Sequence, residues 1–416
     1  MATNVTETTN TNQDRTEETT AMASLTTCVA GRNVIHGPSI WTDLLELFKR
    51  HPDPVYFGDG SPDKDLIPLE RLKEASIRAW DDAPGCLGYG EQQGFAPLRD
   101  LIVERMRPLG IEGSADRILV TSGSTQGLDL ACRVFLEPGD VVLLENPTFL
   151  GATEIFRAYE ARLVPVDTDA DGMVMDALEA ALIAEPRTKM IYTIPTFQNP
   201  TGSTMPLERR QRLVELARQH NVAVLEDDPY SELRYDGDVV APLVALDHNV
   251  IYLGTFSKTI APGIRCGWTL APAGIHRLLV ANREVSDISN DRIMMRTVYH
   301  AAEGFLTDHV AGSLDVYRSR RDAMLGALGE YLPETVTWSH PDGGFFVWIT
   351  LPEHINATDL ANQAADNGVI YFPGHWFYPN ADEFNSIRLS YSTVPEDRIV
   401  EGIRRLGETL RSAPGA

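Results

Sequence analysis

The chain has 416 residues, of which 43% are hydrophobic and 23% are charged, a balance typical of a soluble globular protein. It is too long for one simple hydrophobic core, so we expect two domains. The formal net charge of −23, with no stripe of lysine and arginine, argues against nucleic acid as a partner.

The sequence shows no clear signal for membrane insertion, secretion or disulfide formation. No window reaches the roughly 18 apolar residues of a membrane span. The N-terminus has neither the basic nor the apolar region of a signal peptide. The four cysteines are scattered without a CxxC pair, which favours reduced thiols over disulfides or a metal site. We therefore expect a cytoplasmic protein with no membrane partner and no metal.

The N-terminal segment divides into a tail and a first ordered part. Residues 1–30 are rich in Thr, Asn and Glu and have few large apolar residues, which predicts a disordered tail. A capped amphipathic helix is predicted over Ser39–Arg50. We expect residues 31–80 to form the first part of a small domain that is completed at the other end of the chain.

Residues 81–296 alternate short apolar runs with helical stretches, which predicts a large α/β domain. Continuous apolar strands separated by helices indicate a mainly parallel sheet that is buried on both faces. Helices are predicted over Thr125–Phe135, Phe149–Ala158, Asp176–Ala184 and Leu207–His220. The seven predicted strands are RILVTSG, DVVLLENP, ARLVPVD, KMIYTIP, VAVLEDD, VIYLGTF and RCGWTLAP.

The pattern changes after about residue 296. A long helical region to about Tyr331 precedes the strand-like runs FFVWITLP, VIYFPG and SIRLSYS. Helices are predicted near Ala357–Asn367 and over Pro395–Ser412. We interpret residues 297–416 as the C-terminal part of a smaller α+β domain.

Lys258 is the most informative residue of the chain. It is one of only five lysines, it follows the buried run VIYLGTF, and Arg265 comes seven residues later. An amine and a guanidinium so placed suit an aldehyde cofactor that carries a phosphate, because the amine can form a Schiff base and the guanidinium can pair with the phosphate. A lysine that snorkels into solvent from a strand end is the alternative for this residue taken alone.

Polar motifs follow four other predicted strands, at the edge where α/β sheets bind ligands. In TSGSTQG, Ser124 and Thr125 open a helix whose free N–H groups favour an anion, although an ordinary helix cap would look the same. In ENPTFLGA, Phe149 could stack on a flat ring or belong to the core. In QNPTG, Asn199 could donate a hydrogen bond to a phenolate-like oxygen or simply form an Asn-Pro turn.

The fourth motif is EDDPY, at the end of VAVLEDD. A carboxylate at the end of a buried strand is costly unless it meets a partner. For Asp227 that partner could be a protonated pyridine nitrogen, and Tyr230 could hydrogen-bond the ring oxygen. Glu226 and Asp228 are expected to be exposed acids of a loop.

The set SGSTQG, QNPTG, EDDPY, TFSKTIAPGIRCGW, PDGGFFVW and SIRLSYS resembles fold-type I, class I/II pyridoxal phosphate aminotransferases. The resemblance covers roughly residues 37–412 and is closest to the 2-aminoadipate and kynurenine aminotransferase subgroup. It implies a homodimer with active sites at the subunit interface and pyridoxal 5′-phosphate as cofactor. The substrates would be an L-amino acid and a 2-oxo acid, with 2-oxoglutarate as the expected acceptor.

The resemblance also implies a role for each motif residue. Lys258 would be the Schiff-base lysine and proton shuttle, and Arg388 of SIRLSYS would bind the substrate carboxylate, with Gly60 and Asn199 beside it. The other cofactor contacts would come from Ser124, Thr125, Phe149, Asn199, Asp227, Tyr230, Thr255, Ser257 and Arg265, with Tyr89 reaching the phosphate of the neighbouring subunit.

Two departures from the subgroup concern the substrate. The first helix has Trp41–Thr42 where an arginine often receives an acidic side chain, and Asp59 interrupts a glycine pair. An unpaired carboxylate would repel a second carboxylate on the substrate. We therefore expect an apolar, aromatic or basic donor rather than 2-aminoadipate.

Two alternatives to an aminotransferase stay open at this point. A lyase, decarboxylase or racemase could use the same scaffold, because the motifs secure only cofactor binding and carbanion formation. A non-enzymatic regulator is the other, but the short acidic N-terminal region argues against a DNA-binding domain.

Overall fold

The computed structural model describes residues 30, 32, 48–49, 51, 53–82, 85–380 and 383–412. The predicted tail and the helix over Ser39–Arg50 lie outside the described residues, except for Ala30 and the helical pair Phe48 and Lys49. Trp41–Thr42 also lies outside them. No described helix is both long enough and apolar enough to cross a membrane.

The large sheet has the strand order β2-β9-β8-β7-β6-β3-β4-β5. All seven predicted strands are present, and a short eighth strand, β5, extends the sheet beyond β4. The strands are β2 (Ile118–Thr121), β3 (Val141–Asn146), β4 (Arg162–Asp169), β5 (Gly172–Met173), β6 (Thr188–Thr193), β7 (Ala223–Asp228), β8 (Ile251–Thr255) and β9 (Gly267–Leu270).

Strand direction decides where the loops of this sheet lie. The five strands β4, β3, β6, β7 and β8 run parallel to one another. β9 runs antiparallel to β8, with Thr255 opposite Gly267, and β2 and β5 are also antiparallel to their neighbours. The polar ends of β3, β6, β7 and β8 therefore meet at one edge, to which the loop from β8 to β9 returns.

Helices cover both faces of the large sheet, as continuous apolar strands require. Alternate residues face opposite sides, so Val141 and Leu143 belong to one apolar cluster and Val142 and Leu144 to another. The first cluster includes residues of α4 (Ala96–Met106), α7 (Met175–Ala184), α8 (Leu207–His220) and α11 (Arg292–Ala302). The second includes residues of α5 (Ser124–Phe135), α6 (Leu150–Ala158) and α10 (Ala273–Ser286).

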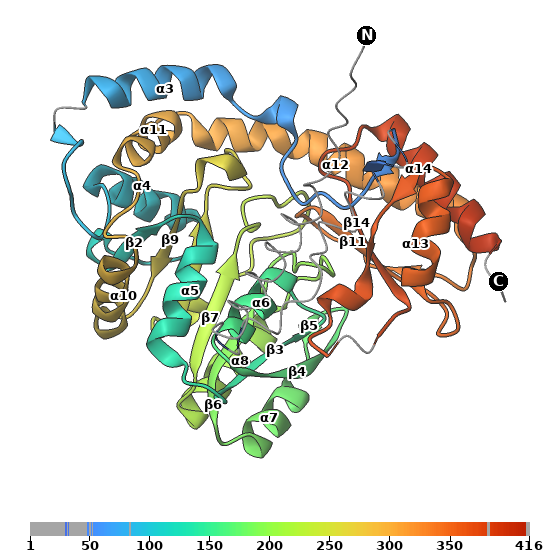
Figure 1. The fold of residues 1–416 in the computed structure, drawn as a ribbon, viewed down its shortest axis with the longest axis horizontal. Coiled ribbons are helices and arrows are strands. Elements are labelled where there is room, and N and C mark those ends of the chain that lie inside the picture. The colour runs from blue at the N-terminus through green and yellow to red at the C-terminus, as the bar shows by residue number, and fades with distance from the viewer. Residues whose placement is uncertain are drawn as a thin grey trace, which may run out of the picture.

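A smaller α+β unit lies beside the large sheet (Figure 1). Its antiparallel sheet has the order β10-β11-β14-β13, and β1 pairs with β12 in a second sheet. Its strands are β1 (Val55–Tyr56), β10 (Thr337–Trp338), β11 (Phe346–Thr350), β12 (Val369–Ile370), β13 (Phe372–Pro373) and β14 (Ser386–Ser390). Its helices are α12 (Leu306–Tyr331), α13 (Ala357–Asp366) and α14 (Glu396–Arg411).

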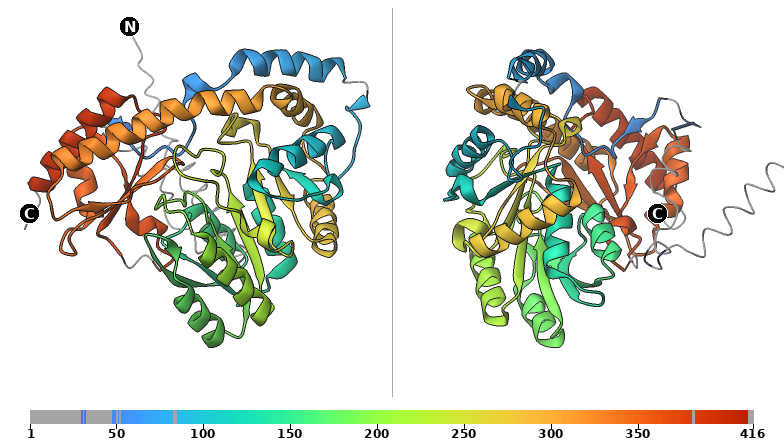
Figure 2. Two further views of the ribbon diagram at one scale, coloured as in Figure 1. Left: turned by 180° about the vertical axis from the view of Figure 1, so that it is seen from behind. Right: turned by 60° about the vertical axis from the view of Figure 1, so that its left-hand side comes forward.

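The N-terminal and C-terminal parts of the chain meet in this smaller unit through β1 and β12. Helix α3 (Leu69–Asp81) instead lies along α11 (Figure 2). Domain boundaries at residues 80 and 296 stay a prediction. The remaining short helices are α9 (Leu243–Leu246) and the 3-10 turns Lys64–Leu66, Arg107–Leu109, Ala115–Arg117, Pro262–Ile264 and Gly374–Phe377.

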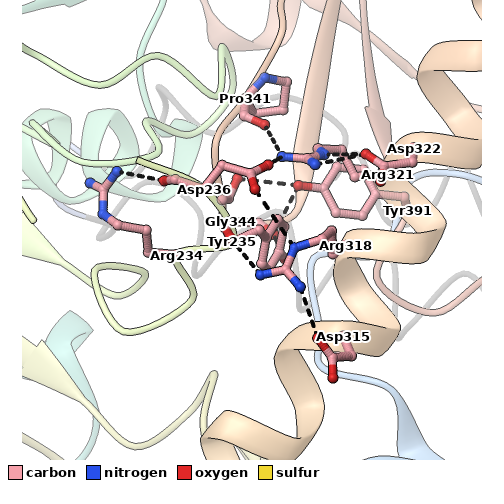
Figure 3. Close-up of polar contacts among 11 residues, drawn as sticks. Arg234, Tyr235, Asp236, Asp315, Arg318, Arg321, Asp322, Pro341, Gly344 and Tyr391 are labelled. Carbon is pink, nitrogen blue, oxygen red and sulfur yellow. Dashed lines mark hydrogen bonds and ion pairs between the residues drawn. The ribbon is translucent and has the colours of Figure 1, made fainter. Parts of the chain in front are cut away.

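A polar network fastens the loop after β7 to α12 (Figure 3). Asp236 pairs with Arg321 at 2.6 Å and with Arg318 at 3.7 Å, and Arg318 also donates to the carbonyl of Tyr235. The hydroxyls of Tyr235 and Tyr391 both donate to the carbonyl of Gly344. These contacts join the loop after β7 of the large sheet to the smaller unit.

Candidate active site

A cavity of about 420 Å³ opens where the ends of β3, β6, β7 and β8 face the small sheet. Its walls include Asp227 of β7, Thr255 of β8, Phe346 of β11 and Arg388 of β14. The place agrees with the rule that open α/β sheets bind ligands beyond the carboxyl ends of their strands.

All but one of the residues predicted for the site line this cavity. Tyr89 is the exception: it is 87% exposed and does not line the cavity. The lining residues from the prediction are Gly60, Ser124, Thr125, Phe149, Asn199, Asp227, Tyr230, Thr255, Ser257, Lys258, Arg265 and Arg388.

Lys258 follows β8 and extends its amine toward the segment after β1. Its Nζ donates to the carbonyl of Gly60 at 2.7 Å and lies 5.9 Å from the ring centre of Tyr230. Removal from water lowers the pKa of the amine to about 8, while the charge of Asp59 opposes that change. A neutral amine, the form that attacks carbonyl carbon, is therefore accessible near neutral pH.

Asp227 is a buried carboxylate with one unused oxygen. Its Oδ2 accepts a hydrogen bond from the hydroxyl of Tyr192 at 2.9 Å, whereas its buried Oδ1 has no partner in the described protein. Burial raises the pKa of Asp227 to about 7, and the Tyr192 bond opposes the rise. A free, buried acceptor on a cavity wall is suited to a cationic N–H group of a ligand.

The part of the cavity wall formed by the start of α5 and by Arg265 is suited to an anion. Helix α5 begins at Ser124 after Gly123, no side chain caps it, and its first N–H groups have no partner within the helix. Gly123 has φ 79°, and a Cβ there would lie 2.3 Å from Nη2 of Arg265. The Thr255 hydroxyl donates to Ser257 Oγ at 2.8 Å beside this helix end. Hydroxyls, N–H groups and a guanidinium converge as a phosphate requires.

Arg388 is 5% exposed and is stacked among aromatic rings. Its guanidinium carbon lies 4.3 Å from the ring centre of Phe346, 4.7 Å from that of Phe372 and 4.8 Å from that of Phe377. It donates to Asn199 Oδ1 at 3.1 Å and to the carbonyl of Gly58 at 2.6 Å, while its buried Nε has no partner in the described protein. Burial lowers its pKa to about 10. This desolvated cation can take a carboxylate.

Asp59 lies on the cavity wall and is half-buried. Its Oδ1 accepts from the backbone N–H of Ser61 at 2.8 Å, and none of the ion pairs in the described part of the chain includes it. Its charge favours the protonated forms of Lys258 and Arg388 and so opposes the lowering of their pKa values by burial. The cavity therefore contains an anion that no salt bridge neutralises.

The expectation that Glu226 and Asp228 are exposed was wrong. Both are buried, with exposed fractions of 0% and 6%. Glu226 accepts from the N–H groups of Leu243 and Val244 at the start of α9, and Asp228 accepts from Tyr252 and Ser231. These hydrogen bonds make their burial tolerable, and a local sequence pattern does not reveal the ones that come from Leu243, Val244 and Tyr252.

Several cavity-supporting residues were missed by the sequence reasoning. Tyr192 orients Asp227, and Phe346 and Phe372 pack against Arg388. Glu145 and Gln198 lie behind the turn that contains Asn199. Glu145 could have been found by the same sequence signal as Asp227, because each is an acidic residue at the end of a buried strand.

The chemistry of the wall fits pyridoxal 5′-phosphate. The unused Oδ1 of Asp227 matches a protonated ring nitrogen, the amine of Lys258 matches the aldehyde carbon, and the uncapped α5 terminus matches the phosphate. Among the described residues, no group of three or more His, Cys, Asp or Glu could hold a metal ion.

Comparisons with known proteins agree with this geometry. Residues 52–406 match the family model for aminotransferase class I and II. An aromatic-amino-acid aminotransferase 1 of Thermococcus litoralis is 42% identical over 378 residues, which cover 89% of this chain and 90% of that protein. A 2-aminoadipate transaminase of Thermus thermophilus is 36% identical over 377 residues, covering 89% of this chain and 93% of that protein.

The crystal structure of Pyrococcus horikoshii kynurenine aminotransferase with PMP superimposes with a TM-score of 0.90 at 38% identity. The superposition covers 95% of this chain and all of that chain. The predicted resemblance is confirmed, and the fold is that of fold-type I. The chain belongs to the class I and II aminotransferase family and is an aminotransferase whose cofactor is pyridoxal 5′-phosphate.

Proposed function

We propose that the enzyme moves the amino group of an L-amino acid with an apolar, aromatic or basic side chain to a 2-oxo acid, with 2-oxoglutarate as acceptor. Asp59 on the cavity wall is the observation that carries the donor preference. The names of the relatives span aromatic, 2-aminoadipate and kynurenine donors, so they leave the donor of this chain open.

Lys258 is proposed as the catalytic residue. When bound, pyridoxal phosphate supplies a carbonyl for amine exchange and a ring that accepts electrons from the substrate Cα. Lys258 Nζ would remove the proton at Cα and return it to the former aldehyde carbon, two bonds away across the nitrogen, since its lowered pKa of about 8 lets it act as both base and acid. Asp227 Oδ1 holds the ring nitrogen in its protonated form.

The remaining wall residues are proposed to hold the cofactor in place. Phe149 stacks on the ring, and Asn199 and Tyr230 donate to the ring oxygen. The phosphate is bound by Arg265 and by the side chains and N–H groups of four further cavity residues, namely Ser124, Thr125, Thr255 and Ser257.

Arg388 is proposed to bind the carboxylate that every amino acid substrate shares. Its stacking on three rings removes it from water, so its pairing with a carboxylate is stronger than at a surface. Asn199 and the backbone at Gly60 border the same place. This contact fixes one end of the substrate and directs the side chain toward the Asp59 region.

Asp59 is proposed to set the charge of the accepted side chain. Two carboxylates in one partly desolvated cavity repel each other, whereas a cationic or hydrogen-bond-donating side chain is attracted. Because Asp59 is half-exposed, solvent screens this repulsion and 2-oxoglutarate is tolerated as acceptor.

The active enzyme is proposed to be a cytoplasmic homodimer. The exposed Tyr89 supports this, because a side chain 87% exposed in one subunit is available to the phosphate site of a second. Sedimentation should give twice the chain mass, and Tyr89→Phe should weaken cofactor retention without changing that mass.

A half-reaction tests the function directly. The holoenzyme is mixed with one amino acid and no acceptor, and conversion of the cofactor to its amine form is followed by absorbance. Leucine, phenylalanine and lysine should convert it, and 2-oxoglutarate should restore the starting spectrum. Release of carbon dioxide or racemised amino acid without the amine form would contradict the proposal.

A further inference from the structure

The amide of Asn199 is held in one orientation. Its Oδ1 accepts from Arg388 Nη1 at 3.1 Å, so its NH2 group is directed away from the arginine. Asn199 is only 6% exposed and lines the cavity. A displacement of its backbone would lengthen or break the Arg388 bond, so the geometry of the site depends on the turn from Gln198 to Thr201.

The side chain of Gln198 holds that turn through hydrogen bonds on the side away from the cavity. Its Nε2 donates to Glu145 Oε2 at 3.1 Å and to the carbonyl of Pro147 at 2.8 Å. Its Oε1 accepts from both the N–H and the hydroxyl of Thr201 at 2.8 Å. Gln198 is 2% exposed and does not line the cavity. Both ends of its amide are therefore used to fix the turn, and none of its contacts reaches the cavity itself.

Glu145 anchors Gln198 to the large sheet. It is 1% exposed and accepts from Thr193 Oγ1 at 2.6 Å, from the N–H of Ile194 at 3.2 Å and from Gln198. None of the ion pairs in the described ranges includes it. A buried carboxylate without a cation costs stability, so its stabilising role alone is a weak reason for its presence.

We propose that Glu145 and Gln198 are positioning residues that orient Asn199, and through it Arg388, for the substrate. Only an acceptor at position 145 can take the Gln198 amide while it also takes Thr193 and Ile194. Loss of this acceptor lets Gln198 turn, and the loop then moves Asn199 away from Arg388. This inference rests on the proposed substrate role of Asn199 and Arg388.

Four single variants test the inference, with full kinetics for one donor and thermal unfolding of the holoenzyme. Glu145→Ala and Gln198→Ala should each raise KM for the donor about tenfold, and kcat should fall by a smaller factor because Asn199 is also proposed to donate to the ring oxygen. Glu145→Gln should restore most of the affinity, since its Oε1 can accept from Gln198 and its NH2 can donate to Thr193. Thr193→Val is the matched control, because it removes a bond to the same carboxylate without touching the turn, and its KM should be unchanged.

A double-mutant cycle separates positioning from general loss of structure. If Glu145 acts through Asn199, Glu145→Ala should add almost nothing to the KM of Asn199→Ala. Additive effects, or an equal KM change in Thr193→Val, would overturn the inference. Should Glu145→Ala not fold, the cycle of Gln198→Ala with Asn199→Ala decides in the same way.

The same cycle distinguishes the failure of the proposed function. If Asn199→Ala itself leaves KM unchanged, the substrate role of Asn199 is wrong and the positioning role falls with it. If Asn199→Ala raises KM but Glu145→Ala and Gln198→Ala change only the unfolding temperature, the proposed function stands and the positioning inference is wrong.

Discussion

The two walls of the cavity each contain a buried charged residue, and the two residues differ in their hydrogen-bond partners. On the large-sheet wall, Asp227 is hydrogen-bonded by Tyr192 through one oxygen, and the other oxygen has no partner in the described protein. On the small-sheet wall, Arg388 is enclosed by three aromatic rings and bonded to Asn199 and Gly58. The first wall has a free hydrogen-bond acceptor, which we proposed for the cofactor, and the second has a desolvated cation, which we proposed for the substrate carboxylate.

From this difference we infer that one wall contributes mainly to the chemical step and the other mainly to substrate binding. If contacts of the large-sheet wall act on the reacting atoms, as proposed, changes there should lower kcat for every substrate. If contacts of the small-sheet wall act on substrate groups that bind equally before and during reaction, as proposed, changes there should raise KM. The following variants test this division.

Lys258→Ala should have the largest effect. The substitution removes both the amine that binds the cofactor and the group that moves the proton, so turnover should fall by more than about 10⁴-fold. Turnover is measured on purified, folded protein. Lys189→Ala is the control, because Lys189 is exposed at the start of β6. Substantial turnover in Lys258→Ala would remove Lys258 from the chemistry.

Asp227→Asn should retain the cofactor and lose most of kcat. An amide cannot hold the ring nitrogen protonated, and one contact of this kind is worth about 2–4 kcal/mol, or roughly 30- to 1000-fold in rate. Asp228→Asn is the matched control, since Asp228 is equally buried and does not line the main cavity. A rate within a few-fold of wild type would mean that Asp227 does not face the ring.

Arg388→Ala should lower kcat/KM for all donors alike by about 10- to 100-fold, mainly through KM, because a charged hydrogen bond contributes about 1.5–3 kcal/mol. Arg388→Lys should recover little, since an ammonium cannot make the two-point contact or the flat stacking of guanidinium. Losses confined to donors with one kind of side chain would place Arg388 in the specificity pocket and not at the shared carboxylate.

Asp59→Asn should have the smallest effect, and it should depend on the donor. Without the carboxylate, kcat/KM for 2-aminoadipate should rise relative to lysine by about five- to tenfold, or about 1–1.4 kcal/mol. Donors are compared at one fixed acceptor. Asp65→Asn, an exposed acid of the same segment, should leave the ratio unchanged. A wild-type preference for 2-aminoadipate over leucine, phenylalanine and lysine by roughly tenfold would refute the donor proposal.

The sequence predicted well which residues line the cavity, where those residues follow strand ends. Lys258, Asp227 and Asn199 each follow an apolar run, and parallel strands bring such positions to one edge whatever the details of packing. The supporting residues were not predictable in the same way. Glu145 meets Gln198 across 53 positions of sequence, and Arg388 meets Gly58 across 330.

The errors have the same origin. Glu226 and Asp228 follow the apolar run of β7 and were assigned to an exposed loop, yet α9 and Tyr252 supply their hydrogen bonds. Whether a buried carboxylate has hydrogen-bond partners depends on which distant donors reach it. The hydrophobic periodicity of the sequence does not show which donors those are. The extra strand β5 is only two residues long, which is too short for an alternating pattern to show.

The antiparallel direction of β9 has a consequence for how this protein can vary in length. A parallel strand after β8 would need a crossover of a dozen or more residues. Here Thr255 is opposite Gly267, and the ladder continues from the N–H of Phe256 to the carbonyl of Cys266 at 3.0 Å. Lys258 and Arg265 therefore lie on one short loop clamped at both ends. Loops elsewhere on the molecule can absorb insertions, but one added residue in this loop would displace the amine and the guanidinium together.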